Sequence, residues 1–194
     1  MSRLIAYVVK HDYGFAPNPY GGFLTLATCK PGIRDAARVG DVLLGTGSVR
    51  NVGCDGLIYA ARISEIVSTA AYGDQARFAI KRPVAGQGKE RQLGDNIYHL
   101  DGDQWVQRQN PFHDEGNQAT DLSSLRVLVC SEFWYFGDTA PDLAAHFPDV
   151  IKKGPGWRYT TDAQRVSEVL AWLGGFDCGV LGRPSRGGGR RLGS

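Results

Sequence analysis

Hydrophobic residues in this chain gather in many short runs, and each run is bounded by glycine, proline or charged residues. Short runs that are rich in β-branched and aromatic residues are typical of β-strands. The run over residues 57–67 is the longest, and its length predicts a bend within the strand. Strands are therefore predicted at residues 3–9, 23–29, 41–47, 57–67, 97–106 and 126–137, with residues 97–106 forming a hairpin around Asp101-Gly102.

Helical signals are confined to a few segments. Residues 31–39 have proline in the first turn and Gly40 after the last, which favours a short helix. The clearest helix spans residues 161–173, where Thr161 and Gln164 have capping-box spacing and apolar side chains recur on one face. A helix is also predicted at 70–80 and a helical turn at 142–147, whereas 84–96 and 108–124 are predicted to be loops.

Many short strands with intercalated helices predict an α+β fold, built as a small, mostly antiparallel β-barrel with peripheral helices. The length of 194 residues suits one domain, which we assign to residues 1–178. Residues 179–194 are rich in glycine and arginine and lack apolar periodicity. We therefore expect them to form a disordered basic tail.

Composition indicates the cellular compartment of the protein, but it does not indicate its function. No apolar run approaches the ~20 residues that a membrane-spanning helix needs, and the N-terminus does not have the pattern of a signal peptide. The four cysteines are scattered without a CxxC pair, which predicts reduced thiols in a cytoplasmic protein. The net charge of +2 is too small to indicate a nucleic-acid partner by itself.

Common catalytic motifs are missing from the sequence. It contains no Walker loop, GxSxG elbow, HExxH helix or Rossmann fingerprint. The histidines, at positions 11, 99, 113 and 146, do not have metal-ligand spacing with one another or with cysteine. We therefore expect neither a metal nor a cofactor.

The first glycine-rich aromatic cluster is the loop over residues 13–22. Its prolines fix the backbone, so Tyr13, Phe15 and Tyr20 could be held in preset positions for a ligand, while Asn18 offers a donor and an acceptor. The alternative is that Phe15 and the prolines close one end of the barrel. The two interpretations of this loop are equally open.

Two further clusters have the same character. Asp95 and Asn96 precede Tyr98 at a strand entrance, where they form either an Asx turn or hydrogen bonds to a ligand. In the run over 133–136, alternate residues face opposite sides, so Trp134 and Tyr135 cannot both face the same side. One side is core, and the other is either covered by a helix or available for a flat ring to stack on.

Basic residues accompany these clusters. Lys30 and Arg34 lie one helical turn apart at the start of the first predicted helix, where an anion is favoured. They are either a solvated face or a rim that contacts phosphate. Thr46, in the glycine turn that follows the third predicted strand, is added to the candidate ligand contacts.

Four blocks of the sequence resemble a known family. HDYGFAPNPYGGFLTLATCKPGIR, VGDVLLGTG, GDNIY and SEFWYFG, in this order, are similar to the nucleotide modification associated domain family of the second type. The resemblance covers most of residues 3–175. These bacterial and phage proteins are assigned to systems that make or handle modified nucleotides, and the resemblance implies a role near nucleic-acid modification.

VGDVLLGTG also resembles a feature of the PUA-like superfamily, which includes the ASCH, EVE and YTH domains. These are small β-barrels that often hold a modified base in an aromatic cage. This similarity implies the barrel that the strand pattern also predicts. It supplies no catalytic residues to carry across.

The favoured hypothesis is a reader that binds a modified nucleobase or nucleotide, in DNA more than RNA, within a bacterial or phage modification system. It needs no cofactor, and no membrane partner is expected. Protein partners are not specified by the sequence. The candidate ligand contacts are Tyr13, Phe15, Asn18, Lys30, Arg34, Thr46, Asp95, Asn96, Tyr98, Trp134 and Tyr135.

The alternative is a hydrolase or transferase that acts on a modified nucleotide. Its acid–base candidates are His11, Asp12, Asp41 and Asp95, and Cys29 beside Lys30 could be an activated thiol. A third hypothesis is a protein-interaction module, which would show an exposed apolar patch rather than a pocket.

Overall fold

The computed structural model describes residues 2–185. Its strands are β1 (Leu4–Val8), β2 (Leu24–Leu26), β3 (Val42–Thr46), β4 (Leu57–Arg62), β5 (Glu65–Ser68), β6 (Tyr98–Asp101), β7 (Gln104–Gln107), β8 (Arg126–Cys130), β9 (Glu132–Tyr135), β10 (Trp157–Thr160) and β11 (Gly179–Val180). The helices are α1 (Pro31–Ala36), α2 (Thr69–Asp74), α3 (Lys89–Gln92), α4 (Glu115–Asp121) and α5 (Ala163–Leu173), with 3-10 helices η1 (Ala76–Lys81) and η2 (Gly137–Thr139).

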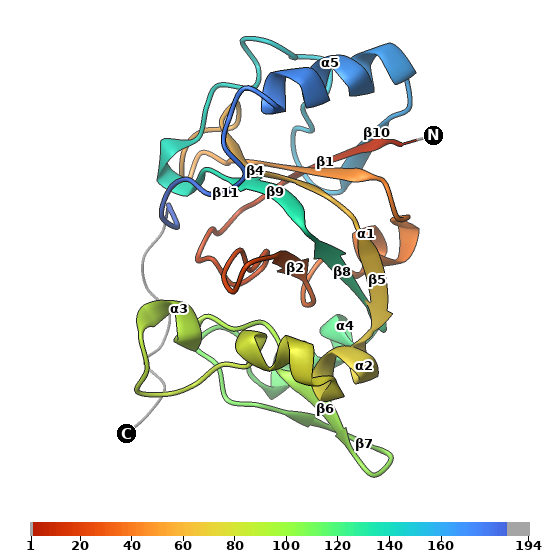
Figure 1. The fold of residues 1–194 in the computed structure, drawn as a ribbon, viewed down its shortest axis with the longest axis vertical. Helices are drawn as coiled ribbons and strands as arrows, with labels where there is room; N and C mark the ends of the chain where they lie inside the picture. The colour runs from red at the N-terminus through yellow and green to blue at the C-terminus, as the bar shows by residue number, and fades with distance from the viewer. Residues whose placement is uncertain (1, 186–194) are drawn as a thin grey trace.

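The strands form a six-stranded mixed sheet, a three-stranded sheet and a hairpin (Figure 1). The large sheet has the order β10-β1-β3-β4-β9-β11, and β1–β3 and β9–β11 are parallel pairs. The small sheet has the order β2-β8-β5 and is antiparallel. The chain runs almost directly from β4 into β5 and from β8 into β9, so these bent strand pairs contribute to both sheets.

The predicted small, mostly antiparallel PUA-like β-barrel is wrong. The α+β class holds, but the described strands form no closed barrel, because β10 and β11 end the large sheet and β2 and β5 end the small one. Alternating apolar residues report that a strand has two faces, but they do not report which strands pair. The parallel pairing of β1 with β3 in particular is a non-local choice that no short motif specifies.

The core lies on both faces of the large sheet. Alternate residues of β1 point in opposite directions, so Ile5 and Tyr7 join one buried cluster while Leu4 and Ala6 join the other. The second cluster is covered by α5 through Val166, Val169 and Leu173. In Figure 1, α5 lies at the opposite end of the molecule from the β6–β7 hairpin, which packs with α2.

The local predictions hold for most elements, and the differences fall in polar segments. The predicted bend divides residues 57–67 between β4 and β5. The last helix begins at Ala163 rather than residue 161, because its cap is Asp162 and not Thr161: the Asp162 carboxylate accepts a hydrogen bond from the backbone N–H of Arg165. The predicted loop over 108–124 contains α4, which begins with a capping box between Asp114 and Asn117. Such a box is short and polar, so the segment lacks an apolar stripe to indicate it.

The first residues of the segment predicted to be a tail are described. β11 pairs in parallel with β9, and the backbone N–H of Ser185 donates to Asp12 at 2.8 Å. Residues 186–194 of that segment lie outside the described residues. Within residues 2–185, none of the helices has both the length and the apolar character required to cross a bilayer.

Candidate active site

Cys29 lies in an unusual backbone turn between β2 and α1. Cys29 and Lys30 have φ angles of 57° and 45°, and no other non-glycine residue among those described has a positive φ. Left-handed conformations of this kind cost on the order of 1–3 kcal/mol each and are often found at functional sites. The turn is held on both sides, because the Cys29 N–H donates to Asp121 Oδ1 at 2.8 Å and Arg34 Nε donates to the Cys29 carbonyl at 2.9 Å.

The Cys29 thiol is the first member of a three-residue relay. Its Sγ lies 3.3 Å from His113 Nε2, and His113 Nδ1 lies 2.5 Å from Asp121 Oδ2. The two ring nitrogens therefore contact a potential nucleophile on one side and a carboxylate on the other. This is the arrangement of nucleophile, general base and orienting acid that occurs in cysteine and serine hydrolases on unrelated folds.

The carboxylate of Asp121, at the end of α4, is fixed by its surroundings. Its Oδ2 also accepts a hydrogen bond from the Tyr98 hydroxyl at 3.0 Å, and its side chain is almost fully buried. Arg34, which is fully buried, donates to the backbone carbonyls of Asp121, Ser124 and Arg126 at 2.5–2.9 Å. These bonds hold the end of α4 against α1. Asp121, at the end of α4, and Cys29, just before α1, therefore keep a fixed relative position.

Charge is concentrated around the thiol. Burial opposes the charged form of the His113 ring, but hydrogen bonds to Asp121 and Cys29 and their negative charges outweigh it, raising the pKa of His113 to about 10. The ring is therefore an imidazolium at neutral pH. Burial lowers the pKa of Lys30, whose ammonium lies 5.2 Å from the centre of the Tyr7 ring. Cys29 thus lies beside two positively charged groups.

A cleft of about 330 Å³ opens onto the relay. Its volume is at the lower end of the range of about 300–1,000 Å³ that is typical of small-molecule sites. The lining residues combine apolar, basic and relay side chains: Tyr7, Val9, Lys10, His11, Ala16, Cys29, Lys30, His113, Asn117, Thr120 and Asp121. The relay is therefore accessible to a ligand rather than sealed in the core.

A row of aromatic rings leads to the cleft. Tyr13 stacks between His11 and Phe112, with ring centroids 5.9 Å and 5.0 Å away and nearly parallel planes. Phe15 contacts Phe112 on one side and meets His113 edge-on at 4.9 Å on the other. The loop over residues 13–22, called the opening loop below, thus supplies Tyr13 to the aromatic row beside the cleft and Phe15 to the packing behind the general base.

The three relay residues are also close enough together to hold a metal ion, since their ligand atoms lie within 4.8 Å of one another. A metal-bound histidine uses one ring nitrogen and commonly donates the other to a carboxylate. In that role Asp121 would orient His113, and only Cys29 and His113 would remain as direct ligands. Zinc sites use three or four protein ligands, so the geometry fits an acid–base relay better.

The structure brings five of the predicted ligand residues to this site. Tyr13 and Phe15 belong to the aromatic row, and Lys30 lines the cleft. Arg34 and Tyr98 lie behind the relay, where they hold Asp121. Their hydrogen bonds give these two residues a positioning role in this arrangement.

Three others lie in a separate buried network. Lys81 Nζ donates to Asn18 Oδ1 at 2.8 Å, Asp95 Oδ1 accepts from the Tyr72 hydroxyl at 2.6 Å, and Asn96 Nδ2 donates to the Tyr72 carbonyl at 2.6 Å. All three predicted residues are at most 1% exposed. Their polar atoms bond to neighbouring strands and loops, so they link the opening loop to α2 and η1.

The last three predicted residues are buried in the large sheet. Thr46 Oγ1 donates to a backbone carbonyl of β1 at 3.3 Å, and Trp134 Nε1 donates to the Phe176 carbonyl at 3.2 Å. The Tyr135 hydroxyl donates to Asp12. Trp134 belongs to the core cluster under α5, and Tyr135 belongs to the cluster on the other face.

Cys29 is among the residues that the sequence indicates as candidates, whereas His113 and Asp121 are not. These two residues lie in the polar segment that was predicted to be a loop, and they are more than 80 positions from Cys29. No spacing rule joins residues that far apart. Two features of the sequence could have indicated the pair. One is a histidine, His113, within a long polar segment, and the other is a thiol next to Lys30 and Pro31.

Comparison with known proteins adds a family. The model of the family described as "Nucleotide modification associated domain 2" matches residues 1–188. The chain therefore belongs to this family, as four blocks of its sequence predicted. No curated protein and no solved structure matches it, and the comparisons show no relationship to the PUA-like superfamily.

Proposed function

We propose that this nucleotide modification associated domain is a cysteine enzyme that cleaves or transfers an acyl group carried by a nucleotide. The observation that carries the proposal is the relay from Cys29 Sγ through the two ring nitrogens of His113 to Asp121. A binding site for a base does not need a thiol, a general base and an orienting carboxylate in this order. An acyl-transfer site does.

The first chemical step uses the thiolate. His113 is an imidazolium at neutral pH and already holds a proton on Nε2, so the Cys29 sulfur attacks the carbonyl carbon of the substrate as the thiolate paired with this ring, and a C–S bond forms. The tetrahedral intermediate collapses when the bond from that carbon to nitrogen or oxygen breaks, and His113 donates its proton to the leaving group. Lys30, which lines the cleft, stabilises the negative charge that develops on the carbonyl oxygen.

The second step releases the acyl group from Cys29. His113 takes a proton from water, or from an acceptor amine, which attacks the thioester carbon. The C–S bond breaks and the thiol is restored, so no oxidant, reductant or cofactor is consumed. Asp121 stays ionised throughout and holds Nδ1–H of the ring, which keeps Nε2 directed at the sulfur.

Two observations support a nucleotide as the carrier of the acyl group. The family description concerns nucleotide modification. The row of His11, Tyr13 and Phe112 reaches the cleft at His11, so a base in the cleft would contact the end of this row, and contact with such rings contributes about 1–3 kcal/mol. We propose DNA over RNA as the source of the nucleotide, and a cytoplasmic setting, because a catalytic thiol has to stay reduced.

A reader of modified bases is the second candidate, and the same aromatic row favours it. In that function the cleft binds the base without turnover, and the relay is dispensable for binding. The two candidates differ in what Cys29→Ser does. The enzyme loses its product while binding persists, whereas the reader loses nothing.

The test is covalent trapping. N4-acetyl-dCMP and N6-acetyl-dAMP, free and within short oligonucleotides, are incubated with the protein, and the intact protein mass and released nucleotides are measured. Wild-type protein and Cys178→Ser, which replaces an exposed cysteine outside the relay, are expected to form the acyl adduct and release the nucleotide. Cys29→Ser and His113→Ala are expected to do neither. Binding of these nucleotides without adduct or product in wild-type protein would refute the enzyme and leave the reader.

A further inference from the structure

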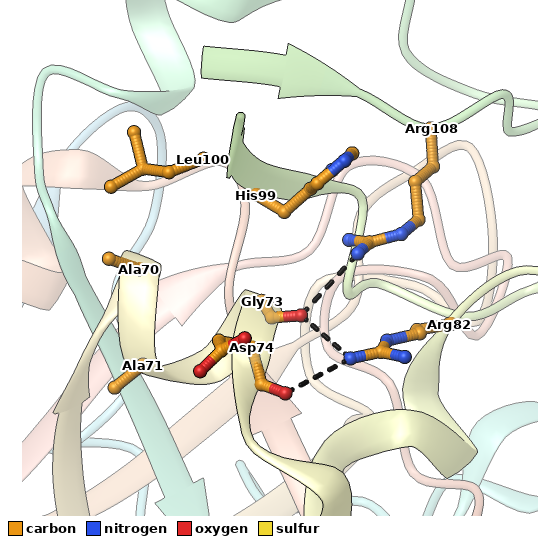
Figure 2. A pocket seen from close by; sticks show the side chains of 8 residues that line it. All are labelled: Ala70, Ala71, Gly73, Asp74, Arg82, His99, Leu100 and Arg108. Atoms are coloured by element: carbon orange, nitrogen blue, oxygen red, sulfur yellow. Dashed lines mark hydrogen bonds between the residues drawn. The ribbon is translucent and has the colours of Figure 1, made fainter. Parts of the chain in front are cut away.

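A second pocket of about 380 Å³ lies on the other side of β6 from the relay. Tyr98 and His99 are neighbours in this strand and therefore point in opposite directions. Tyr98 contacts Asp121, while His99 lines the second pocket. Figure 2 shows the pocket between α2, β6 and the two arginines, with the lining residues Ala70, Ala71, Gly73, Asp74, Arg82, His99, Leu100 and Arg108.

Two guanidinium groups converge in this pocket. Arg82 Nη2 donates to the Gly73 and Asp74 carbonyls at 2.9 and 3.2 Å, and Arg108 Nη2 donates to the same Gly73 carbonyl at 3.4 Å (Figure 2). Arg108 Nη1 also donates to the Asn96 carbonyl at 3.3 Å. The carbonyls fix both side chains in place, so little conformational entropy remains to be lost when a ligand binds.

The pocket floor depends on the absence of a side chain at Gly73. A Cβ atom there would approach the Tyr98 carbonyl to 2.5 Å, which is closer than real contacts allow. Glycine therefore lets α2 lie directly against β6, and the Gly73 carbonyl reaches both arginines. The positions of Arg82 and Arg108 are a consequence of this close packing.

The positive charge of the pocket has little compensation. Among the ion pairs of residues 2–185, none involves Arg82 or Arg108. Arg82 Nε is enclosed and donates to no described residue. The carboxylate of Asp74 points away from both guanidinium groups in Figure 2.

The electrostatics agree with this geometry. Burial and then the charge of Arg82 lower the pKa of Arg108. Burial, Arg108 and Arg82 likewise lower the pKa of His99, and Asp101 opposes them only in part. The neighbouring guanidinium groups therefore disfavour the charged forms of Arg108 and His99, and an anion between them would remove that repulsion.

We propose that this pocket binds a phosphate group of a nucleotide ligand. Planar guanidinium groups donate two parallel hydrogen bonds to phosphate oxygens, and His99 can add a third. The proposal goes beyond the acyl-transfer function and does not depend on Cys29. Arg108 and His113 are five residues apart, so their Cα atoms are separated by at most about 18 Å. Because the two sites lie on opposite sides of β6 within this distance, a strand of several nucleotides could place a phosphate in this pocket and a base in the cleft.

The first experiment leaves the protein unchanged. The ring resonances of His99 are followed by NMR while inorganic phosphate is added at constant ionic strength, with chloride as the balancing anion. Phosphate is expected to raise the pKa of His99, because the anion stabilises the imidazolium. His146, which contacts Trp172 under α5, serves as the internal control and is expected not to respond. An unchanged His99, or equal responses of both histidines, would overturn the proposal.

The second experiment identifies the source of the phosphate. dCMP and a short single-stranded oligodeoxynucleotide are titrated by fluorescence anisotropy against wild-type protein, Arg82→Gln, Arg82→Lys and Arg158→Gln. Arg158 is exposed on β10, so Arg158→Gln is the control for loss of one charge. Arg82→Gln is expected to weaken oligonucleotide binding at least tenfold, Arg82→Lys less, and Arg158→Gln hardly at all.

Comparing the affinities for dCMP and for the oligonucleotide distinguishes the two sources of phosphate. Tighter binding of the oligonucleotide than of dCMP assigns the site to a strand phosphate, and equal binding assigns it to a free nucleotide. Equal weakening by Arg82→Gln and Arg158→Gln would overturn the proposal, because only overall charge would then matter. A failure of acyl transfer with an intact response of His99 would refute the proposed function and leave the phosphate pocket standing.

Discussion

Asp121→Asn is the sharpest test of the relay because it changes charge with almost no change of shape. Asp121 accepts hydrogen bonds from the Cys29 N–H, the His113 ring and the Tyr98 hydroxyl. The asparagine oxygen can keep the bond to Cys29. Its NH2 group then faces His113 Nδ1, donates to it, and places the ring proton on Nε2. A ring in this tautomer cannot accept the proton of the thiol.

The expected loss follows from this tautomer. An equivalent change of the orienting carboxylate in serine hydrolases lowers kcat by about 10⁴ with little change of geometry. We expect a loss of about 10³–10⁴ in kcat for acyl transfer, with KM nearly unchanged. Alkylation of Cys29 by iodoacetamide at pH 6 is expected to slow at least tenfold, because the imidazolium that supports the thiolate is lost.

The same substitution has a predicted effect on stability. A pKa raised from 6.5 to about 10 corresponds to at most ~5 kcal/mol in favour of the charged ring of His113. Because the pKa is raised in the folded state, this stability is fully present below pH 6.5 and is lost as the pH rises to about 10. The contribution of His113 to the free energy of unfolding in urea should therefore decrease between pH 6.5 and 10, and Asp121→Asn should remove most of this pH dependence.

NMR titration of His113, iodoacetamide kinetics and urea unfolding at pH 6 and pH 9 measure these effects. Asp103→Asn, at an exposed position in the β6–β7 turn, is the matched control and should behave as wild type. If Asp121→Asn leaves both the pKa of His113 and the alkylation rate unchanged, the relay does not exist in solution. The argument for a cysteine enzyme would fail with it.

Three other substitutions test the relay, the packing of the large sheet and the buried hydrogen bonds of the opening loop. Tyr98→Phe removes one hydrogen bond to Asp121, so kcat should fall about tenfold with KM unchanged, as steady-state kinetics would show. Gly45→Ala places a methyl group against the Tyr59 ring and should lower the unfolding free energy by about 1–3 kcal/mol in urea. Lys81→Met leaves buried acceptors of the opening loop unpaired and should cost about 2–4 kcal/mol at pH 7. Burial lowers the pKa of Lys81 to about 8, so the contribution of this group to stability should rise from pH 8 to 10.5 and offset part of the loss that His113 causes; the stability difference between wild type and Lys81→Met should therefore grow over this range.

Much of the local structure was predictable from the sequence. β1, β3, β4 and β9 coincide with apolar runs because their side chains are buried on one or both sides of the sheet. β10 was missed because it is short and its residues are largely exposed, as suits an edge strand. The open arrangement was not predictable, because closure depends on pairings between strands that are far apart in the chain.

The candidate site was predictable only in part, for a related reason. Tyr13, Phe15, Lys30, Arg34 and Tyr98 were selected as ligand contacts; Lys30 lines the cleft, Tyr13 and Phe15 pack beside it, and Arg34 and Tyr98 lie behind the relay. Sequence patterns indicate that a polar or aromatic residue needs a partner, but they do not indicate whether that partner is a ligand or another residue. Asn18, Asp95 and Asn96 have internal partners, which only the fold reveals.

Asp121 connects the strained turn at Cys29 to the chemistry of the relay. One carboxylate oxygen holds the Cys29 N–H and so stabilises a left-handed backbone, while the other holds the His113 ring. A structural role alone would need only the first bond, and a general base alone would need only the second. Because both bonds come from one buried group that Arg34 anchors through its carbonyl, Sγ and Nε2 are positioned by the same element. The conformational free energy that the left-handed turn costs is therefore explained if the reaction needs the thiol at this distance from the base. A cleft that only binds a ligand does not need this distance.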